Sequence, residues 1–290
     1  MTAAAPTSTS WNSPGGGAGQ NRHGGLFHPD NPRWFPDGER FAFNGGVGGF
    51  SDGIYVFDLN SGAPPTKISP SGNYVLPDVS PDGLNVAFQE VYGGMYTVGS
   101  FGEEFQQLTG YSAHVRWSPK GTKLAYSNWA SGGDRTDLFI YDLVAGAEKQ
   151  ITNAASGHHF IIADWSPDGL TLLATLRTPD GYEDILVLDL AGTILANLTN
   201  TPNQSEGGAT WSPDGRFIVY VGSTPDGATD LFAMKPDGTG KTNLTNSAGV
   251  REALAHVLVR SPCPADFNHD GEINSLDFIA FLNAYTAGCD

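Results

Sequence analysis

One short phrase recurs along the chain and constrains its fold more than any other feature. A large apolar residue, usually Trp, is followed by Ser-Pro-Asp-Gly or a close variant, and then by a short apolar stretch. Five copies span residues 34–38, 79–83, 117–121, 165–169 and 211–215. Their prolines lie 45, 38, 48 and 46 residues apart. This period is typical of the four-stranded blade of a β-propeller.

Each copy of the phrase predicts a hairpin turn between two strands, because Pro presets φ, Asp bonds the backbone ahead and Gly accepts a positive φ. The apolar residue before the turn is expected to pack between blades rather than to bind a ligand. In the fourth repeat, Leu170–Leu176 and the apolar run Ile185–Leu188 predict two further strands. A closing phrase, Asn197–Asn200 in this repeat, completes a unit of four strands.

The repeated phrases resemble the WD-like repeats of the TolB family. The matching features are the Trp-Ser-Pro-Asp-Gly turn, the stretch Phe41–Phe43, and the runs Ile54–Asp58 and Leu138–Asp142. The resemblance covers about residues 27–246 and implies an all-β, TolB-like β-propeller, usually six-bladed in that family. Five repeats are clear, and a partial sixth begins at Glu252–Ser261. We therefore expect five four-stranded blades plus a fragment.

A calcium-binding loop is predicted near the C-terminus. The segment Asp266–Asp277 has the spacing of an EF-hand loop, in which every second residue offers an oxygen to a hard cation. The ligands are expected to be Asp266, Asn268, Asp270, the Glu272 carbonyl, Asn274 through water, and Asp277, with Ca²⁺ as the cofactor. A helix is expected to follow from Ser275. The alternative for this segment is an acidic surface turn.

Cys263 and Cys289 flank this loop and are the two cysteines of the chain, a pattern typical of a local disulfide. The bracketed segment resembles the single-loop, GC-type dockerin modules. Full dockerins carry two such loops and bind cohesin, so the resemblance implies a cohesin-like or cell-surface partner for the tail. The expected organisation is a flexible segment 1–26, a propeller 27–261 and a dockerin-like module 262–290.

Charge and hydropathy exclude some classes of partner and location. Acidic residues outnumber basic ones, 31 to 15, for a net charge of −16, which disfavours nucleic-acid binding. The sequence contains no run of 18 apolar residues, so it predicts no membrane span. The first 20 residues lack the charged and apolar regions of a signal peptide and read as a mature N-terminus. With the disulfide and the dockerin resemblance, we expect a secreted or cell-surface bacterial protein.

The sequence contains no motif for catalysis, such as a nucleophile elbow, a phosphate loop or His-Glu-x-x-His. The acids that open the third strand of three repeats, Asp137, Asp184 and Asp230, are interpreted as structural. We therefore expect that the chain is not an enzyme.

A ligand-binding surface is expected where the innermost strands begin. His28 and His159 each lie six residues before a repeat Trp, which places both at the rim of the central funnel. His158, Trp129 and Tyr182 are expected on the same rim, where they would recognise a protein or a glycan. The alternatives are histidines that line a channel or face solvent, or histidines that hold a metal, as in some lyases that resemble TolB.

Two functions compete. The first is a secreted, non-catalytic binding propeller whose calcium-binding tail anchors or docks it, with a link to the use of extracellular polysaccharide. The second is a polysaccharide lyase or glycosidase that uses the funnel. A weaker third is a periplasmic partner-binding role like that of TolB.

Overall fold

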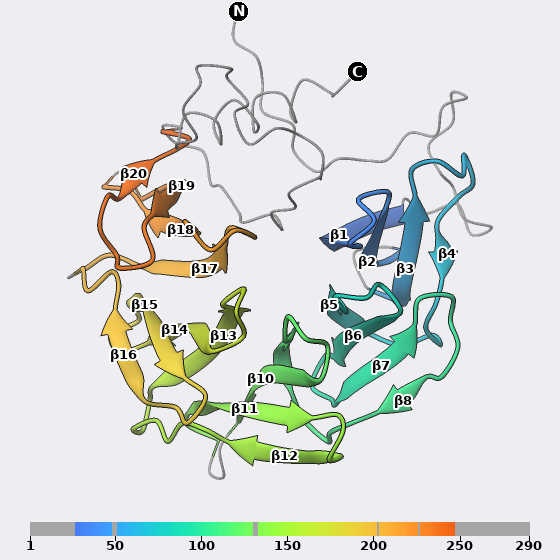
Figure 1. Cartoon of the computed structure of the whole chain (residues 1–290), viewed down its shortest axis with the longest axis horizontal. Coiled ribbons are helices and arrows are strands. Elements are labelled where there is room, and N and C mark those ends of the chain that lie inside the picture. Colours follow the sequence, from blue (N-terminus) through green and yellow to red (C-terminus); the bar gives the residue numbers. More distant parts are fainter. Residues whose placement is uncertain (1–26, 48–50, 130–132, 202, 226, 247–290) are drawn as a thin grey trace, which may run out of the picture. The chain divides into compact units, whose positions relative to one another are not determined.

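The computed structural model describes residues 27–47, 51–129, 133–201, 203–225 and 227–246. All secondary-structure elements within these ranges are β-strands (Figure 1). The chain forms two compact units, Met1–Trp117 and Ser118–Asp290. The division falls inside the third repeat, just before its Ser-Pro-Lys-Gly turn. The predicted sixth repeat, calcium loop, helix and disulfide lie outside the described residues.

The first unit contains the first two repeats and one strand of the third. Its first sheet has the order β1 (Phe27–Trp34), β2 (Arg40–Val47), β3 (Gly53–Asp58), β4 (Thr66–Lys67). Its second sheet has the order β5 (Tyr74–Val79), β6 (Asn85–Glu90), β7 (Met95–Gly99), β8 (Gln106–Gln107). The last strand of this unit, β9 (Ala113–Trp117), opens the third repeat.

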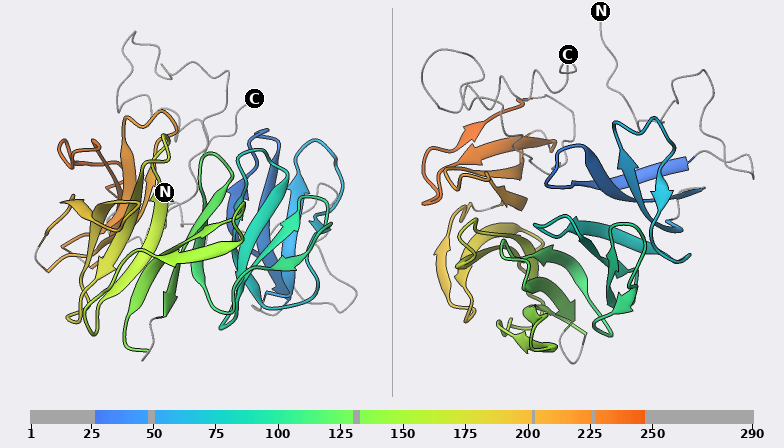
Figure 2. Two further views of the ribbon diagram at one scale, coloured as in Figure 1. Left: turned by 60° about the horizontal axis from the view of Figure 1, so that its bottom comes forward. Right: turned by 45° about the vertical axis from the view of Figure 1, so that its right-hand side comes forward.

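The second unit contains the other strands (Figure 2). The third repeat continues with β10 (Lys123–Trp129), β11 (Thr136–Asp142) and β12 (Ala147–Gln150). The fourth consists of β13 (His159–Trp165), β14 (Thr171–Arg177), β15 (Glu183–Asp189) and β16 (Ile194–Asn197). The fifth consists of β17 (Glu206–Trp211), β18 (Ile218–Ser223), β19 (Thr229–Met234) and β20 (Thr242–Asn243). The predicted four strands per repeat are thus confirmed for all five repeats.

The recurring phrase forms the turn between the first and second strands, as predicted. In the fourth repeat, the Gly169 amide donates to the Ser166 carbonyl over 2.8 Å, and the Ser166 hydroxyl donates to Asp168 over 2.6 Å. Gly169 has φ +72°, a conformation that glycine adopts without steric cost. The following strand begins at Thr171, one residue later than expected, and Leu170 is exposed.

The apolar run of β15 is buried on both faces. Leu186 and Leu188 belong to one hydrophobic cluster, together with Trp165 and other residues of the third and fourth repeats. Ile185, on the other face, belongs to a second cluster shared with the fifth repeat, and Val187 packs against it. Alternate residues of a strand point to opposite faces, so an unbroken apolar run is the expected pattern for a strand between two layers. This prediction is confirmed.

The repeat tryptophans mark the joints between successive repeats. Trp165 is buried within the core, whereas Trp211 is partly buried against its cluster. The Trp211 amide donates to the Asp164 carboxylate over 2.9 Å, and the Thr210 hydroxyl donates to the same oxygen over 2.7 Å. An aspartate one residue before one repeat Trp therefore holds the backbone of the next.

The acids that open the third strands are structural, as the sequence indicated. The Asp137 carboxylate is fully buried and accepts hydrogen bonds from Thr152 Oγ1 over 2.9 Å and from Gln150 Nε2 over 3.1 Å. In the next two repeats, Asp184 and Asp230 accept equivalent bonds from the Asn that ends the fourth strand and from the Thr two residues later. Each pair of hydrogen bonds, which we call a clasp, connects the third strand of a repeat to the end of its fourth strand.

Candidate functional site

Strand register aligns one row of residues along one end of the second unit. Each member is paired with the next across neighbouring strands: Trp129 with Thr136, Thr136 with His159, His159 with Arg177, Arg177 with Glu183, and Glu183 with Ser205. Backbone pairing across three repeats holds these positions side by side. We call this row and the loops just beyond it the rim of the second unit.

Three of the predicted ligand-binding residues lie at the start of β13 or pack against it. The rings of Trp129 and His159 meet edge to face, with centroids 5.5 Å apart. The Trp129 side chain is 55% exposed, so its other face is open to solvent. His158 precedes β13, and its Nδ1 lies 3.2 Å from the Ser156 carbonyl oxygen.

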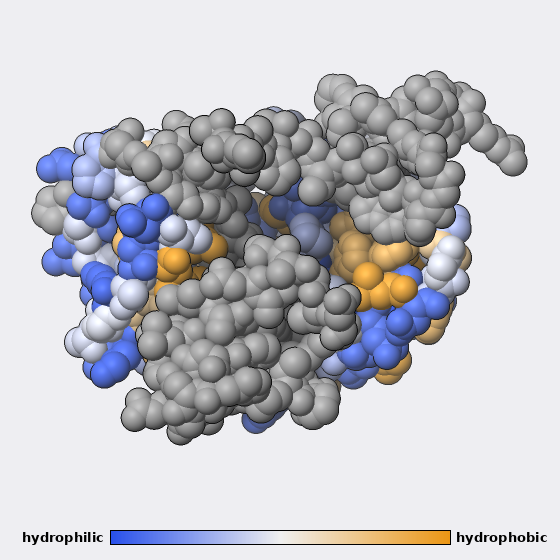
Figure 3. All heavy atoms as spheres, turned by 90° about the horizontal axis from the view of Figure 1, so that it is seen from above, coloured by the Kyte–Doolittle hydropathy of each residue, from blue (hydrophilic) through white to orange (hydrophobic). Residues whose placement is uncertain are grey.

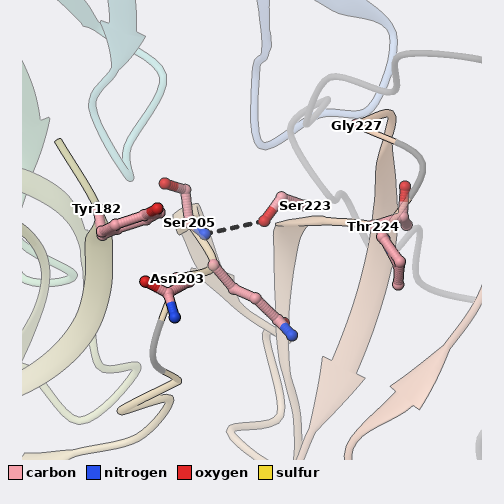
Figure 4. Close-up of a pocket in the computed structure, with 8 residues that line it drawn as sticks. Tyr182, Asn203, Ser205, Ser223, Thr224 and Gly227 are labelled. Atoms are coloured by element: carbon pink, nitrogen blue, oxygen red, sulfur yellow. Dashed lines mark hydrogen bonds between the residues drawn. The ribbon is translucent and has the colours of Figure 1, made fainter.

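Tyr182 lies on the same rim, in the loop between β14 and β15, and its side chain is 37% exposed. It lines a cavity of about 470 Å³ together with Asn203, Ser205, Ser223 and other residues. Figure 4 shows the Tyr182 ring pointing toward Ser205. The structure thus gathers Trp129 with His159, and separately places Tyr182 on a cavity wall.

The fifth predicted residue, His28, is the second residue of β1 in the first unit. Its side chain lies outside the described residues. The prediction that His28 shares a recognition surface with the second unit therefore stays a prediction.

The charged groups of the rim are held by local contacts. A hydrogen bond from Ser156 is the main cause that lowers the pKa of the Asp134 carboxyl. Burial raises the pKa of the Glu183 carboxyl, and the nearby Arg177 guanidinium opposes this increase. The Arg135 Nη2 donates to the Asn153 side chain over 3.0 Å. Of the two acids, Asp134 is exposed and Glu183 is partly buried.

The sequence analysis missed an exposed aromatic residue at the corresponding loop of the second repeat. Tyr92, between β6 and β7, is 95% exposed and has φ +62°. Tyr182 lies in the equivalent loop of the fourth repeat, and Trp129 is the last residue of β10, the strand that precedes this loop in the third. These residues lie 11 (Tyr92), 10 (Trp129) and 15 (Tyr182) positions after the proline of their turns, so they share a junction but not one aligned position. On the face drawn in Figure 3, hydrophobic residues reach the surface among hydrophilic ones.

Within the described residues, no group of three or more His, Cys, Asp or Glu side chains is arranged to hold a metal ion. The alternative of a histidine-held metal therefore has no candidate ligand set in this part of the chain. The loop Asp266–Asp277, the predicted calcium site, lies outside it.

A buried acid behind the rim was also missed. Glu206, the first residue of β17, is 5% exposed, and its Oε2 has no hydrogen-bond partner in the described part of the chain. Burial raises the pKa of the Glu206 carboxyl, and the nearby Asp184 charge raises it further. A hydrogen bond from Thr201 lowers this pKa in part. Burial and, to a smaller extent, the Glu206 charge raise the pKa of Tyr220 to about 12.

We expect Glu206→Gln to make stability less dependent on pH. The folded-state pKa of the Glu206 carboxyl is raised above its ordinary value of 4.5, so this carboxyl stays protonated to a higher pH in the folded chain than in the unfolded chain. Its contribution to the free energy of unfolding therefore falls as the pH rises above that value. Glutamine does not ionise, so the stability gained by the substitution should be near zero around pH 4 and grow toward about pH 7. Urea unfolding across this range measures it, with exposed Glu39→Gln as the control. An equal gain at every pH would contradict the assignment.

Comparison with known proteins agrees with the repeat structure. The sequence pattern of the family described as TolB beta propeller domain matches residues 102–258, more than half of the chain. The chain belongs to this TolB beta propeller family. No curated protein matches its sequence. The described part of this TolB beta propeller has no helix able to span a membrane.

Solved structures show the same fold at low sequence identity. Putative TolB from Agrobacterium tumefaciens is 22% identical, with a TM-score of 0.61, over 76% of this chain and 80% of that one. TolB from Acinetobacter baumannii is 21% identical, with a TM-score of 0.58, over 76% and 54%. An oligogalacturonate lyase in complex with manganese is 18% identical, with a TM-score of 0.55, over 78% and 71%. Both TolB proteins and an enzyme thus share the fold of this TolB beta propeller.

Proposed function

We propose that this chain is a non-catalytic binding module that recognises an extracellular glycan or protein with the rim of its propeller. The observation that carries the proposal is the row of paired residues from Trp129 to Ser205, which places the exposed Trp129 at the same end of the second unit as the loop that carries the exposed Tyr182. Concave, preformed surfaces with convergent aromatic and polar groups favour ligands. Aromatic side chains offer large contact areas at a small entropic cost.

The second candidate is a carbohydrate-active enzyme. It is favoured by the adjacent His158 and His159 at the rim and by the likeness in fold to an oligogalacturonate lyase. Fold likeness alone does not carry an activity. A panel of polysaccharides, tested with and without chelator, separates the two: binding without turnover supports the binding module, and release of shorter products overturns it.

The C-terminal segment is proposed to anchor the propeller through calcium. If the segment adopts the loop that its EF-hand spacing predicts, Asp266, Asp270 and Asp277 would bring three negative charges, with the amide of Asn268, around one point. Without a cation these carboxylates repel one another, and bound Ca²⁺ cancels the repulsion. A disulfide between Cys263 and Cys289 would hold the ends of the loop together. A cohesin-like or cell-surface partner is proposed for the folded tail.

We expect Asp266→Ala to abolish the calcium-dependent stability of the tail. A ligand at 100 times its dissociation constant stabilises its domain by about 2.7 kcal/mol, and this gain requires the ligand at position 1 of the loop. Calorimetry with Ca²⁺ and with chelator measures it. The propeller transition should not respond to chelator, and Asp237→Ala, at an exposed turn of the propeller, should keep the calcium response. Unchanged calcium binding in Asp266→Ala would show that Asp266 is not a ligand.

A further inference from the structure

The cavity beside Tyr182 is formed by three separate segments of the second unit. Tyr182 comes from the loop before β15, Asn203, Gln204 and Ser205 from the segment before β17, and Ser223 and Thr224 from the end of β18. Its volume of about 470 Å³ falls within the range of small-molecule sites, roughly 300–1,000 Å³. Figure 4 shows these residues around one space.

The lining has a distinctive chemistry, because none of the described residues that line the cavity has a side chain that is charged at neutral pH. It combines one aromatic ring, two amides and several hydroxyls. Amides and hydroxyls both donate and accept hydrogen bonds, and the ring offers an apolar face. A sugar ring has the matching surface, with hydroxyls that donate and accept and one face made of C–H groups.

The surrounding charge favours a neutral sugar over an acidic one. Glu183 is paired with Ser205 at the edge of the cavity. Glu206, the residue after Ser205, is the first residue of β17. The whole chain carries a net charge of −16. A uronate or a phosphorylated sugar would meet this negative field, whereas a neutral ring would not.

The walls of the cavity are held in place by backbone hydrogen bonds. The Ser223 amide donates to the Ser205 carbonyl, and the Ser205 amide donates to Ser223 Oγ, each over 2.9 Å. The Thr178 amide donates to the Tyr182 carbonyl over 2.9 Å, which closes the loop that carries the ring. Ser223 Oγ keeps its own proton to donate. Preformed walls reduce the entropic cost of binding.

Two amide groups at the cavity remain available. The side chains of Asn203 and Gln204 make no hydrogen bond to other described residues of the chain. Asn203 has φ +61°, a left-handed conformation that asparagine tolerates better than most residues. The turn therefore presents both amides where a ligand can reach them.

We infer that this cavity is a subsite for one neutral sugar unit of a polysaccharide, with Tyr182 stacked on the C–H face and Asn203, Gln204 and Ser223 bonding the hydroxyls. The inference rests on the proposed function and narrows its ligand to uncharged glycans. It also separates this subsite from the Trp129–His159 pair, which contacts another part of the same ligand.

Calorimetric titration with neutral glucan, xylan and mannan oligosaccharides and with oligogalacturonate tests the inference. We expect a neutral oligosaccharide to bind, and Tyr182→Ala to weaken it by about tenfold, since stacking and burial of one ring contribute on the order of 1–2 kcal/mol. Tyr182→Phe keeps the ring and should retain most of the affinity. Asn203→Gly removes an amide but accepts the positive φ, and should weaken binding severalfold. Leu195→Ala, an exposed residue of β16, is the matched control.

The outcomes distinguish the subsite from the proposed function. Wild-type affinity in both Tyr182→Ala and Asn203→Gly, with loss in Trp129→Ala, would overturn the subsite and leave the binding module standing. Preference for oligogalacturonate would overturn the assignment to neutral sugars. If no carbohydrate of either class binds, both the subsite and the glycan-binding form of the proposed function fail. Circular dichroism of each variant confirms that it folds.

Discussion

Asp137→Ala is expected to lower the free energy of unfolding by about 3–5 kcal/mol, the range for removing one partner from a buried, hydrogen-bonded charge. The carboxylate is fully buried. It accepts bonds from Thr152 Oγ1, the Ala154 amide and Gln150 Nε2, and Arg135 Nε lies 3.6 Å away. Alanine leaves Thr152 Oγ1 and the Ala154 amide without this acceptor and opens a cavity.

Urea unfolding of the Asp137 variants measures this effect. Asp137→Asn keeps one carbonyl oxygen as an acceptor, so its cost should be smaller than that of the alanine variant. Asp237→Ala, in an exposed turn with bonds to Thr239 alone, should cost less than about 1 kcal/mol. If Asp137→Ala were as mild as Asp237→Ala, the clasp between the third and fourth strands would contribute little to stability.

Gly192→Ala is expected to destabilise the second unit far more than Gly146→Ala. Both glycines lie in turns between the third and fourth strands, and both have a positive φ, +89° and +62°. A Cβ on Gly192 would lie 1.6 Å from the carbonyl oxygen of Ile151, whereas a Cβ on Gly146 would meet nothing within 4 Å. The two substitutions therefore share a conformational penalty and differ in a clash with backbone.

We expect Gly146→Ala to cost about 1–2 kcal/mol from the left-handed conformation alone. Gly192→Ala should cost about 1–3 kcal/mol more, because the backbone of the preceding repeat must move. Thermal unfolding of both variants gives the comparison. Equal costs would mean that the turn yields freely and does not pack tightly against Ile151.

Local sequence patterns were sufficient to predict the strands and turns of the described repeats. The Ser-Pro-Asp-Gly turns depend on contacts within four residues, as in Ser166–Gly169, so the amino-acid pattern alone indicates them. The unbroken run in β15 predicted burial on both faces for the same reason. The structural role of Asp137, Asp184 and Asp230 followed from their recurrence in successive repeats, because a residue kept in phase with the fold usually serves the fold.

The candidate site was predicted less completely, since its parts are far apart in the chain. The position of Tyr182 at the rim could be inferred from its repeat. Its neighbours Ser205 and Ser223 could not, because they reach it only through pairing between different repeats. His159 contacts Trp129, thirty residues earlier in the chain, through their rings, and the recognition role of this pair stays a prediction.

The amino-acid sequence by itself determined the repeat, its four strands and its turns, because each of these depends on residues close together in the chain; the calcium loop stays a prediction. Only the tertiary structure decided that Glu206 is buried with an oxygen that has no partner among the described residues, that a cavity whose described lining is uncharged opens beside Tyr182, and that Gly192 lies against the Ile151 carbonyl. These features arise where one repeat packs on the next. The environment of a side chain there is set by the register and packing of strands that no local pattern specifies.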